Sequence, residues 1–252
     1  MDSENRPVKT TFTSLAILEV LQELNGATVS ELMEHTELGR STVYNHLQTL
    51  SDSEYVVKEG AEYHVGMKLF HLGEYTRGRK DEYAFARDAV QDLAEETGME
   101  AGLNIEEHGE IFTLFDKIGN STVSGFDVGS QFHMHCTAAG KAILAELPEK
   151  RRDEIIDTHR LPARTESTIT DQDELLEELT EIREQGYAVN REENVVGYQS
   201  IATVITYPDG RIFGGLAVGG PSYILSDGID QSMYDALFET ANRIESELAT
   251  VW

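Results

Sequence analysis

The sequence predicts an α+β protein of two domains, a winged helix-turn-helix followed by an antiparallel sheet with flanking helices. Helical apolar spacing recurs three times before residue 52, and two short strand-like runs follow at once. After residue 80, strand pairs alternate with helical segments. With 252 residues, of which 40% are hydrophobic, the chain is long enough to build two cores.

The first helix is expected in the segment TSLAILEVLQELNG. Its apolar residues follow mainly helical spacing, and Gly26 stands just beyond the expected end. The residues that we expect to face a core are Leu15, Leu18, Val20, Leu21 and Leu24.

Two further helices and a hairpin complete the first domain. The segment TVSELMEHT begins with Thr28 and has Glu31 three residues later, which is typical of a capping box at the start of a helix. A tight turn over residues 36–39 leads into a third helix, whose predicted buried stripe is Val43, Leu47 and Leu50.

The run YVVKEGAEYHVG then predicts two short strands joined around residues 59–61, which completes a winged helix-turn-helix. We place this domain at residues 1–66 and a connecting helix at residues 67–80.

The second domain, residues 81–252, mixes helices and hairpins, and this order predicts an antiparallel sheet packed on helices. The expected elements are a helix over Asp81–Thr97, a hairpin over Ala101–Ile118, a helix in TAAGKAILAEL, two acidic helices near Glu149–Thr158 and Asp171–Gln185, a hairpin turned at Pro208, Asp209 and Gly210, and a long helix to Trp252.

The charge is strongly acidic, with 46 Asp and Glu against 20 Lys and Arg and a formal net charge of -26. The acids are interleaved with apolar periodicity, so they indicate solvated faces rather than disorder. We interpret them as the surface of a halophilic protein, because molar salt screens such repulsion. Mimicry of nucleic acid is the alternative, but it would not need a helix-turn-helix.

The sequence also bounds the compartment. The single cysteine, Cys136, cannot form an internal disulfide and excludes the cysteine-rich zinc patterns. No run of 18 uncharged apolar residues occurs, and the start of the chain lacks the apolar region of a secretory signal. We therefore expect a cytoplasmic protein without a membrane partner.

The outward face of the third helix consists of hydrogen-bonding residues, which predicts contact with DNA. Asn and Gln can pair bidentately with adenine, and an Arg at the helix start can hold phosphate or guanine. A merely solvated polar face is the alternative for the helix, and a solubilising charge is the alternative for the wing. The candidates are Arg40, Ser41, Thr42, Tyr44, Asn45 and Gln48 on the helix, and Lys58 and His64 on the wing.

The segment SLAILEVLQELNGATVSELMEHTELGRSTVYNHLQTL resembles the DNA-binding domain of the IclR family of transcription regulators. The segments MHCTAAGKAILAELP and GYAVNREENVVGYQSIATVITYPDGRIFGGLAVGGP are similar to the GAF-like effector domain of that family. The resemblance covers nearly the whole chain. It implies a regulator that binds double-stranded DNA at a palindromic operator as a homodimer or homotetramer, and that responds to a small-molecule effector.

One departure keeps an alternative open. The family commonly carries a basic residue where this chain has Asn45. A metabolite- or metal-sensing protein without specific DNA recognition is therefore the rival interpretation.

The effector site is expected at the start of the helix in CTAAGKA. Its small residues Ala138, Ala139 and Gly140 would leave backbone N–H groups open to an anion or polar ligand, although burial alone also explains why this region lacks acids. The resemblance places effector contacts at Ala138, Ala139, Ser200, Ala217 and Gly219.

Family members often carry serines at the positions of Ala217 and Gly219. Their absence argues against a small oxoacid and favours a sugar acid or an aromatic acid, as expected for the control of a catabolic operon.

The segment FHMHC places His133, His135 and Cys136 together, which raises two further hypotheses. A Cys near a His suggests a nucleophile, and two His at i and i+2 on one strand face suggest a metal site. No further ligand or orienting group is identifiable by spacing. We therefore predict a buried structural Cys, two ordinary His, no metal, no cofactor and no enzymatic activity.

Overall fold

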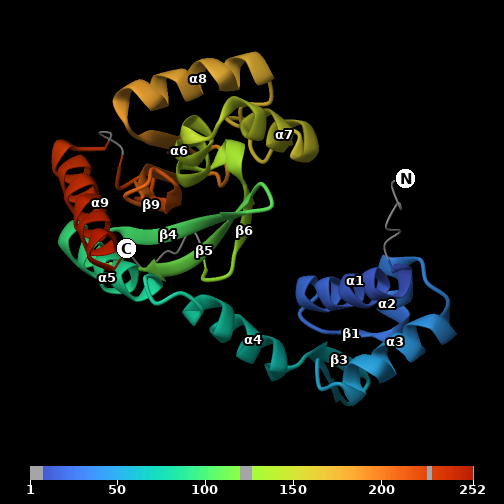
Figure 1. Ribbon diagram of the computed structural model, residues 1–252. Coiled ribbons are helices and arrows are strands. Elements are labelled where there is room, and N and C mark those ends of the chain that lie inside the picture. The colour runs from blue at the N-terminus through green and yellow to red at the C-terminus, as the bar shows by residue number, and fades with distance from the viewer. Residues whose placement is uncertain (1–7, 120–126, 226–228, 252) are drawn as a thin grey trace, which may run out of the picture. The chain divides into compact units, whose positions relative to one another are not determined.

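The computed structural model describes residues 8–119, 127–225 and 229–251 and divides the chain into two compact units, residues 1–79 and 80–252 (Figure 1). Within the described residues, no helix is long and apolar enough to cross a membrane.

Unit 1 is a winged helix-turn-helix. Its elements are α1 (Lys9–Glu23), β1 (Ala27–Thr28), α2 (Val29–Thr36), α3 (Arg40–Asp52), β2 (Val56–Glu59), β3 (Glu62–Val65) and α4 (Met67–Gly78). The three predicted helices, the predicted hairpin and the connecting helix are all present, and the first helix begins earlier than the sequence suggested.

The core of unit 1 lies between α1, α2, α3 and the wing. The predicted stripe of α3 is confirmed, because Val43, Leu47 and Leu50 are buried. The predicted stripe of α1 is only partly right. Leu21 is buried, but Leu15 is 50% exposed and Ile17 faces the core in its place. Ile17 and Leu21 are four residues apart and share one helix face, which Leu15 does not.

The capping box at α2 is confirmed. The side chain of Thr28 accepts a hydrogen bond from the amide of Glu31, and Glu31 Oε2 accepts from the amide of Thr28 at 2.8 Å. The turn before α3 places Glu37 in the left-handed region, with φ of 55°. In the wing, β2 and β3 are antiparallel, and the two-residue strand β1 pairs with β3. A strand of two residues is too short to show an alternation of apolar and polar residues in the sequence.

Unit 2 is a six-stranded antiparallel sheet with helices on both faces. Its elements are α5 (Tyr83–Thr97), β4 (Glu100–Glu107), β5 (Glu110–Lys117), β6 (Gln131–His133), the 3-10 turn η1 (Met134–Cys136), α6 (Ala138–Glu146), α7 (Glu149–His159), α8 (Gln172–Gln185), β7 (Ala188–Arg191), β8 (Tyr198–Thr206), β9 (Ile212–Pro221) and α9 (Gln231–Val251).

The strand order is β6-β5-β4-β9-β8-β7, and every neighbouring pair is antiparallel. The predicted hairpins form β4–β5 and β8–β9. The two edge strands, β6 and β7, were not predicted, because runs of three and four residues carry little alternation.

Two hydrophobic cores lie on the two faces of this sheet. Leu103, Ile201 and Val218 point to one face and pack with α5 and α9. Helix α6 packs on the other face against β8 and β9, with α8 behind it. Alternate residues of β8 and β9 therefore face α6, and this is the face that carries the candidate effector site.

Candidate DNA-recognition helix and effector site

Helix α3, which we call the recognition helix, exposes every residue that the sequence placed on its outward face. Arg40, Ser41, Thr42, Tyr44, Asn45 and Gln48 are all exposed. The opposite side holds the core stripe, and His46 is fixed to α1 by a 2.8 Å hydrogen bond between its Nδ1 and the hydroxyl of Ser14. The core stripe and the hydrogen bond between His46 and Ser14 therefore hold the helix in place, and its polar face points outward.

The recognition helix begins without a side-chain cap. Its N-cap is Gly39, with no side-chain hydrogen bond, while the amides of Thr42 and Val43 bond to the Gly39 carbonyl. Among the residues in the described parts of the chain, none accepts from the amides of Arg40 and Ser41. Free N–H groups and the helix dipole at an exposed N-terminus attract an anion such as a DNA phosphate.

One of the predicted DNA-contacting residues, Gln48, forms a hydrogen bond within the helix. Gln48 Nε2 donates to Asp52 Oδ1 at 2.7 Å. Gln48 must release this carboxylate before its amide can pair with a base. Asp52 is also the first acid after Glu37, so the exposed face between them carries Arg40 as its full charge.

The two wing candidates differ in their surroundings. Lys58 is exposed, and its Nζ lies 5.1 Å from the centre of the Tyr63 ring. His64 is half-buried against Gly26, where a Cβ would come within 2.1 Å of its ring, and its Nε2 lies 3.6 Å from Glu62 Oε2. The geometry thus leaves Lys58 free to reach outward and turns His64 toward the rest of unit 1.

Helix α6 starts deep in unit 2. Ala138 and Ala139 are buried and pack with Ala202 and Ala217 from the sheet. The expectation that Gly140 leaves its N–H open is wrong, because Thr137 is the N-cap and its Oγ1 accepts from the Gly140 amide at 3.1 Å. A Cβ at Gly140 would lie 2.3 Å from the carbonyl of Met134, so the glycine permits a close approach of η1.

The first two amides of α6 remain available. None of the residues described accepts a hydrogen bond from the N–H groups of Ala138 and Ala139. They form a buried helix N-terminus, which favours a negatively charged or polar acceptor.

A row of cross-strand neighbours lies on the face of the sheet that α6 covers. Asn190 pairs with Ser200, Ser200 with Gly219, and Gly219 with Glu100. Residues directly opposite each other in antiparallel strands share a face, so these four residues form a polar row. Ser200 and Gly219 were predicted from the resemblance, whereas Asn190 and Glu100 were missed.

The polar row contains an unsatisfied donor. Asn190 is 1% exposed, its Oδ1 accepts from the amide of Glu193 at 2.9 Å, and its Nδ2 is buried without a partner among the described residues. A buried donor without a partner costs free energy, so it is a candidate for a ligand contact. No spacing in the sequence distinguishes Asn190 from an ordinary strand residue.

The other end of the row is acidic. The hydroxyl of Tyr198 donates to Glu100 Oε2 at 2.6 Å, and Glu100 is 2% exposed. Burial and, after it, the neighbouring Glu100 together raise the pKa of Asp116 to about 7. The Asp116 carboxyl group is therefore partly protonated near neutral pH.

The two positions that lack the serines of the family behave differently. Ala217 is partly buried against α6. At Gly219 a Cβ would lie 2.5 Å from the Cβ of Ser200, so the present backbone has no room for a side chain there. The hydroxyl group of the polar row is that of Ser200, and Tyr198 adds a second hydroxyl beside Glu100.

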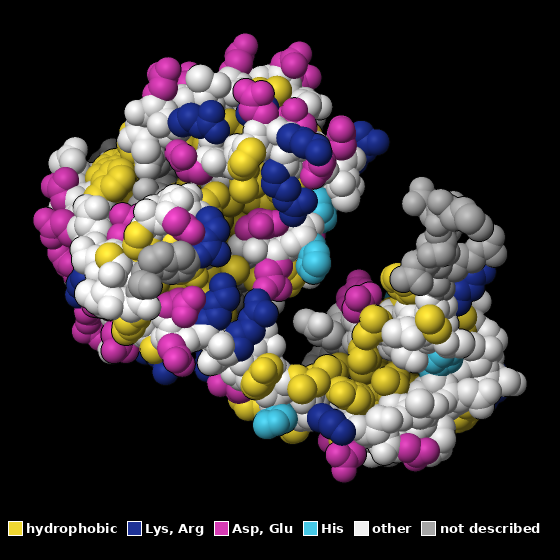
Figure 2. All heavy atoms as spheres, in the orientation of Figure 1, with side chains coloured by type: hydrophobic (Ala, Val, Ile, Leu, Met, Phe, Trp, Pro, Cys, Tyr) yellow, Lys and Arg dark blue, Asp and Glu magenta, His cyan; other side chains and the backbone are white. Residues whose placement is uncertain are grey.

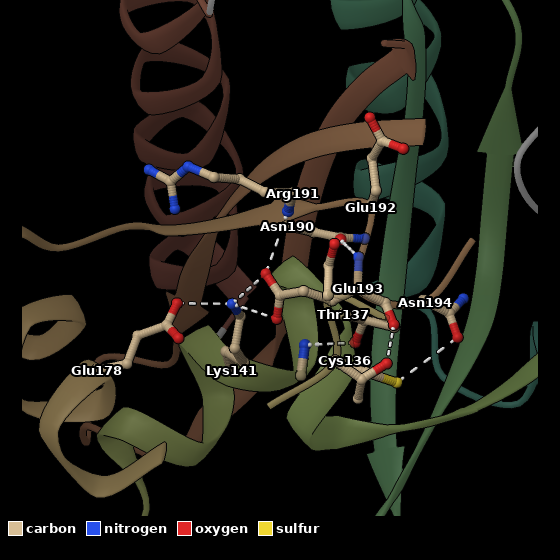
Figure 3. Close-up of polar contacts among 12 residues, drawn as sticks. Cys136, Thr137, Lys141, Glu178, Asn190, Arg191, Glu192, Glu193 and Asn194 are labelled. Carbon is tan, nitrogen blue, oxygen red and sulfur yellow. Dashed lines mark hydrogen bonds and ion pairs between the residues drawn. The ribbon is translucent and has the colours of Figure 1, made fainter. Parts of the chain in front are cut away.

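A buried ion-pair network holds α6 in place (Figure 3). Lys141 has a fully buried side chain, and its Nζ lies 2.6 Å from Glu178 Oε1 on α8 and 2.7 Å from Glu193 after β7. Glu193 Oε1 also accepts from the amide of Arg191 at 3.1 Å. The network therefore ties α6 to α8 and to the segment that positions Asn190, and sequence spacing alone did not reveal it.

The segment FHMHC does not form a single strand, although the ring centroids of His133 and His135 lie 5.7 Å apart. Strand β6 ends at His133 and η1 follows, so His133 and His135 do not share a strand face. His135 Nε2 lies 3.2 Å from the carbonyl of Pro162, and burial lowers the pKa of His135 to about 4. Burial raises the pKa of Cys136 to about 12, and its Sγ donates to Asn194 Oδ1 at 3.6 Å, so no thiolate nucleophile forms.

The helix-turn-helix in residues 14–60 matches the model of the IclR helix-turn-helix domain. Residues 79–246 match the model of the bacterial transcriptional regulator IclR C-terminal domain. The chain belongs to the IclR family. It is therefore a transcriptional regulator with a DNA-binding helix-turn-helix and an effector-binding domain, as the resemblance implied, and not an enzyme.

The similarity to other regulators extends over nearly the full length of this IclR-family chain. A probable helix-turn-helix transcriptional regulator, ArcR, from Halobacterium salinarum is 29% identical over 260 residues, which cover 99% of this chain and 97% of ArcR. A putative transcriptional regulator from Rhodococcus sp. RHA1 has the same fold, with a TM-score of 0.81 at 24% identity, over 98% of this chain and 100% of that one.

The fold is also that of an IclR homolog from Microbacterium hydrocarbonoxydans, whose structure is a complex with 4-hydroxybenzoate. The TM-score is 0.77 at 20% identity, over 94% of this chain and 99% of that one.

Proposed function

We propose that this IclR-family regulator controls a catabolic operon by binding a palindromic operator, under the control of a hydroxylated organic acid. The observation that carries the DNA part is the recognition helix, with an exposed, almost uncharged polar face and an uncapped N-terminus. Binding in the major groove would place the start of α3 at the bases, with its free amides near a phosphate.

The DNA-binding test uses the DNA upstream of the protein's own gene. Footprinting at high salt should give protection by the wild type, and Asn45→Ala should weaken binding by about tenfold or more, because one bidentate base contact contributes ~1–3 kcal/mol. Gln22→Ala, at an exposed position on α1, is the matched control and should bind as the wild type does.

Protection that is absent at every salt concentration would contradict this part of the proposal. It would favour the rival function, a metabolite- or metal-sensing protein without specific DNA recognition. If Asn45→Ala leaves the protection unchanged, the proposed role of α3 in base recognition would be wrong.

The proposed homodimer or homotetramer draws on exposed apolar side chains in unit 1. On α4, Met67 is 74% exposed, Phe70 61% and Tyr75 71%, and on α1 Phe12 is 62% exposed. Figure 2 shows hydrophobic side chains gathered on this unit. A contiguous exposed apolar surface indicates an interface between chains. Two copies related by a twofold axis would match the symmetry of a palindromic operator.

Light scattering tests the assembly. Phe70→Glu should halve the mass of the dimer, or reduce a tetramer, whereas Tyr223→Glu, at a 72% exposed position in unit 2, should leave the mass unchanged. A wild-type mass equal to one chain would contradict the proposed dimer.

The effector class is inferred from the polar row and the start of α6. The amides of Ala138 and Ala139 and the unpaired Nδ2 of Asn190 are donors suited to a carboxylate. Glu100, with Asp116 beside it, is an acceptor suited to hydroxyl groups. A sugar acid or a hydroxyaromatic acid carries both kinds of group, and the Microbacterium homolog in complex with 4-hydroxybenzoate supports the second.

Calorimetric titration of the full chain tests this class. Gluconate or 4-hydroxybenzoate should bind more tightly than benzoate, which lacks the hydroxyl group, and Asn190→Ala should weaken that binding by about tenfold. Tight binding of small oxoacids such as glyoxylate or pyruvate, with none of gluconate or 4-hydroxybenzoate, would contradict the proposed class.

A further inference from the structure

Three potential metal ligands from distant parts of the sequence meet at the edge of unit 2. Glu110 starts β5, His133 ends β6, and His159 ends α7. Their ligand atoms lie within 4.8 Å of one another. Glu110 Oε1 is 3.8 Å from His133 Nδ1 and 3.9 Å from His159 Nδ1. We call these three residues the His–Glu cluster.

The tautomer of His159 suits a metal ligand. Its Nε2 lies 2.8 Å from the carbonyl oxygen of His108, so Nε2 carries the hydrogen and Nδ1 presents its lone pair to the cluster. A histidine that donates its second N–H to a backbone carbonyl is typical of metal sites, because that bond fixes the ring and its tautomer. Gly109 leaves room for this ring, since a Cβ there would lie 2.7 Å from His159 Nε2.

His133 presents an unpaired nitrogen to the same point. Its Nδ1 is buried and has no hydrogen-bond partner among the residues described. Glu110 Oε1 lies 3.8 Å from this nitrogen, which is too far for a hydrogen bond, so a direct bond to Glu110 does not account for the arrangement.

Glu110 is oriented by a neighbour. Gln131 Nε2 donates to Glu110 Oε2, which leaves Oε1 between the two imidazoles. A hydrogen bond that fixes the second oxygen of a carboxylate is the kind of support that metal ligands receive from their surroundings.

We propose that Glu110, His133 and His159 bind one divalent transition-metal ion of the zinc class. Imidazole and carboxylate together suit Zn²⁺, Co²⁺ or Fe²⁺ rather than Mg²⁺ or Ca²⁺, which prefer oxygen ligands alone. Two ligand atoms at ~2 Å from a tetrahedral zinc ion are roughly 3.3 Å apart, so the distances from Glu110 Oε1 to the two histidines need to shorten by about half an ångström. Three protein ligands leave at least one position for water or another ligand.

The ion would cross-link three elements that the backbone connects only over long distances. It would hold the edge strand β6 and the end of α7 against β5, immediately before η1 and the start of α6. The site would therefore stabilise the segment that leads into the effector-binding helix, and this role does not depend on the identity of the organic effector.

The test is metal binding by the full chain after chelation and dialysis, with Zn²⁺ and Co²⁺ as probes. We expect one ion per chain, and a Co²⁺ spectrum without a thiolate charge-transfer band, because Cys136 lies outside the cluster. Glu110→Gln and His159→Gln should each weaken binding by on the order of 100-fold or more, and Gln131→Leu by roughly tenfold.

His108→Asn is the matched control. This residue supplies only its backbone carbonyl, and Asn tolerates its φ of 57°, so metal affinity should remain that of the wild type. The unfolding midpoint should rise with Zn²⁺ in the wild type and in His108→Asn, but not in His159→Gln, whose metal-free midpoint should match that of the wild type. His159→Gln at the end of α7 thereby separates loss of the site from loss of the fold.

Three results would overturn the proposal: a wild type that binds no more metal than Glu110→Gln, a Co²⁺ spectrum dominated by thiolate coordination, or ligand variants with unchanged affinity.

Discussion

The recognition helix α3 and the effector-domain helix α6 each carry one full positive charge near the N-terminus, but the two charges have opposite surroundings. Arg40 is exposed. Lys141 has a fully buried side chain held by Glu178 and Glu193. In α3 the polar groups lie on the outside for recognition, whereas every residue from Ala138 to Ala145 of α6 is buried. We thus assign the basic residue of α3 to DNA binding and the basic residue of α6 to stability.

This contrast also explains how so acidic a chain can bind DNA. The acids are spread over the surface of unit 2, as Figure 2 shows, and are absent from the segment that forms most of α3. Two kinds of substitution test this contrast most strongly. One removes the counter-ion of a buried charge, and the other adds an acid to the recognition helix.

The largest effect is expected at Lys141. Lys141→Ala should destabilise the protein by about 3–5 kcal/mol, because it leaves Glu193 buried without its counter-ion. Urea unfolding measures the change. Lys150→Ala, where the side chain is 91% exposed, should change the free energy of unfolding by no more than about 0.5 kcal/mol.

The pair Lys141 and Glu193 can also be tested together. Lys141→Met combined with Glu193→Gln should recover part of the loss, since the double variant removes both buried charges. A Lys141→Ala variant as stable as Lys150→Ala would show that the network does not hold α6.

A negative charge at the start of α3 should have the next largest effect, on DNA affinity rather than stability. Gly39→Asp should reduce operator binding by roughly 10- to 100-fold, because the carboxylate would cap the free amide of Ser41 and repel phosphate. Gly39→Asn caps the helix without charge and is the matched control. Gel shifts measure both, and equal loss in the two variants would point to a steric cause.

Removal of the exposed cation should have a smaller effect. Arg40→Gln should weaken operator binding by about tenfold, roughly 1.4 kcal/mol, and should leave the unfolding midpoint unchanged. A change in stability with no change in binding would reverse the roles that we assign to Arg40 and Lys141.

The smallest effect is expected for the pH dependence of stability, through Asp116 beside the polar row. The pKa of Asp116 is raised from 3.8 to about 7, so its contribution to stability is fully present below pH 4 and is lost as the pH rises through 7. Asp116→Asn mimics the protonated form. It should raise the free energy of unfolding at pH 8, by roughly 1 kcal/mol once partial exposure is allowed for, and the difference should shrink toward pH 5.

Thermal unfolding at the two pH values tests this expectation. Asp157→Asn, an exposed position on α7, is the control and should show no pH-dependent difference from the wild type. A pH-independent effect of Asp116→Asn would indicate that the carboxyl group titrates normally.

Local sequence signals predicted much of the fold. The capping box of Thr28 and Glu31, the stripe of α3 and the turn between β8 and β9 all depend on residues within a few positions of one another. Such signals give the helix starts, the turns and the exposed face of the recognition helix.

Contacts between distant residues were not predictable in this way. Lys141 is 37 residues from Glu178 and 52 from Glu193, so its burial is visible only once α6, α8 and β7 have packed. The same holds for His159, which reaches the cluster from the end of α7, and for the unpaired amide of Asn190 on an edge strand. The sequence predicted the start of α6 as part of the candidate effector site but did not predict the polar groups that surround it.

The salt dependence of operator binding tests the central claim most directly. A recognition face with Arg40 as its full charge should bind mainly by hydrogen bonds and apolar contacts, because at about 1 M salt the Debye length is only ~3 Å. The logarithm of the binding constant, measured against the logarithm of the KCl concentration, should therefore have a shallow or even positive slope. A steep negative slope, near the -10 of a basic repressor that neutralises many phosphates, would contradict the account.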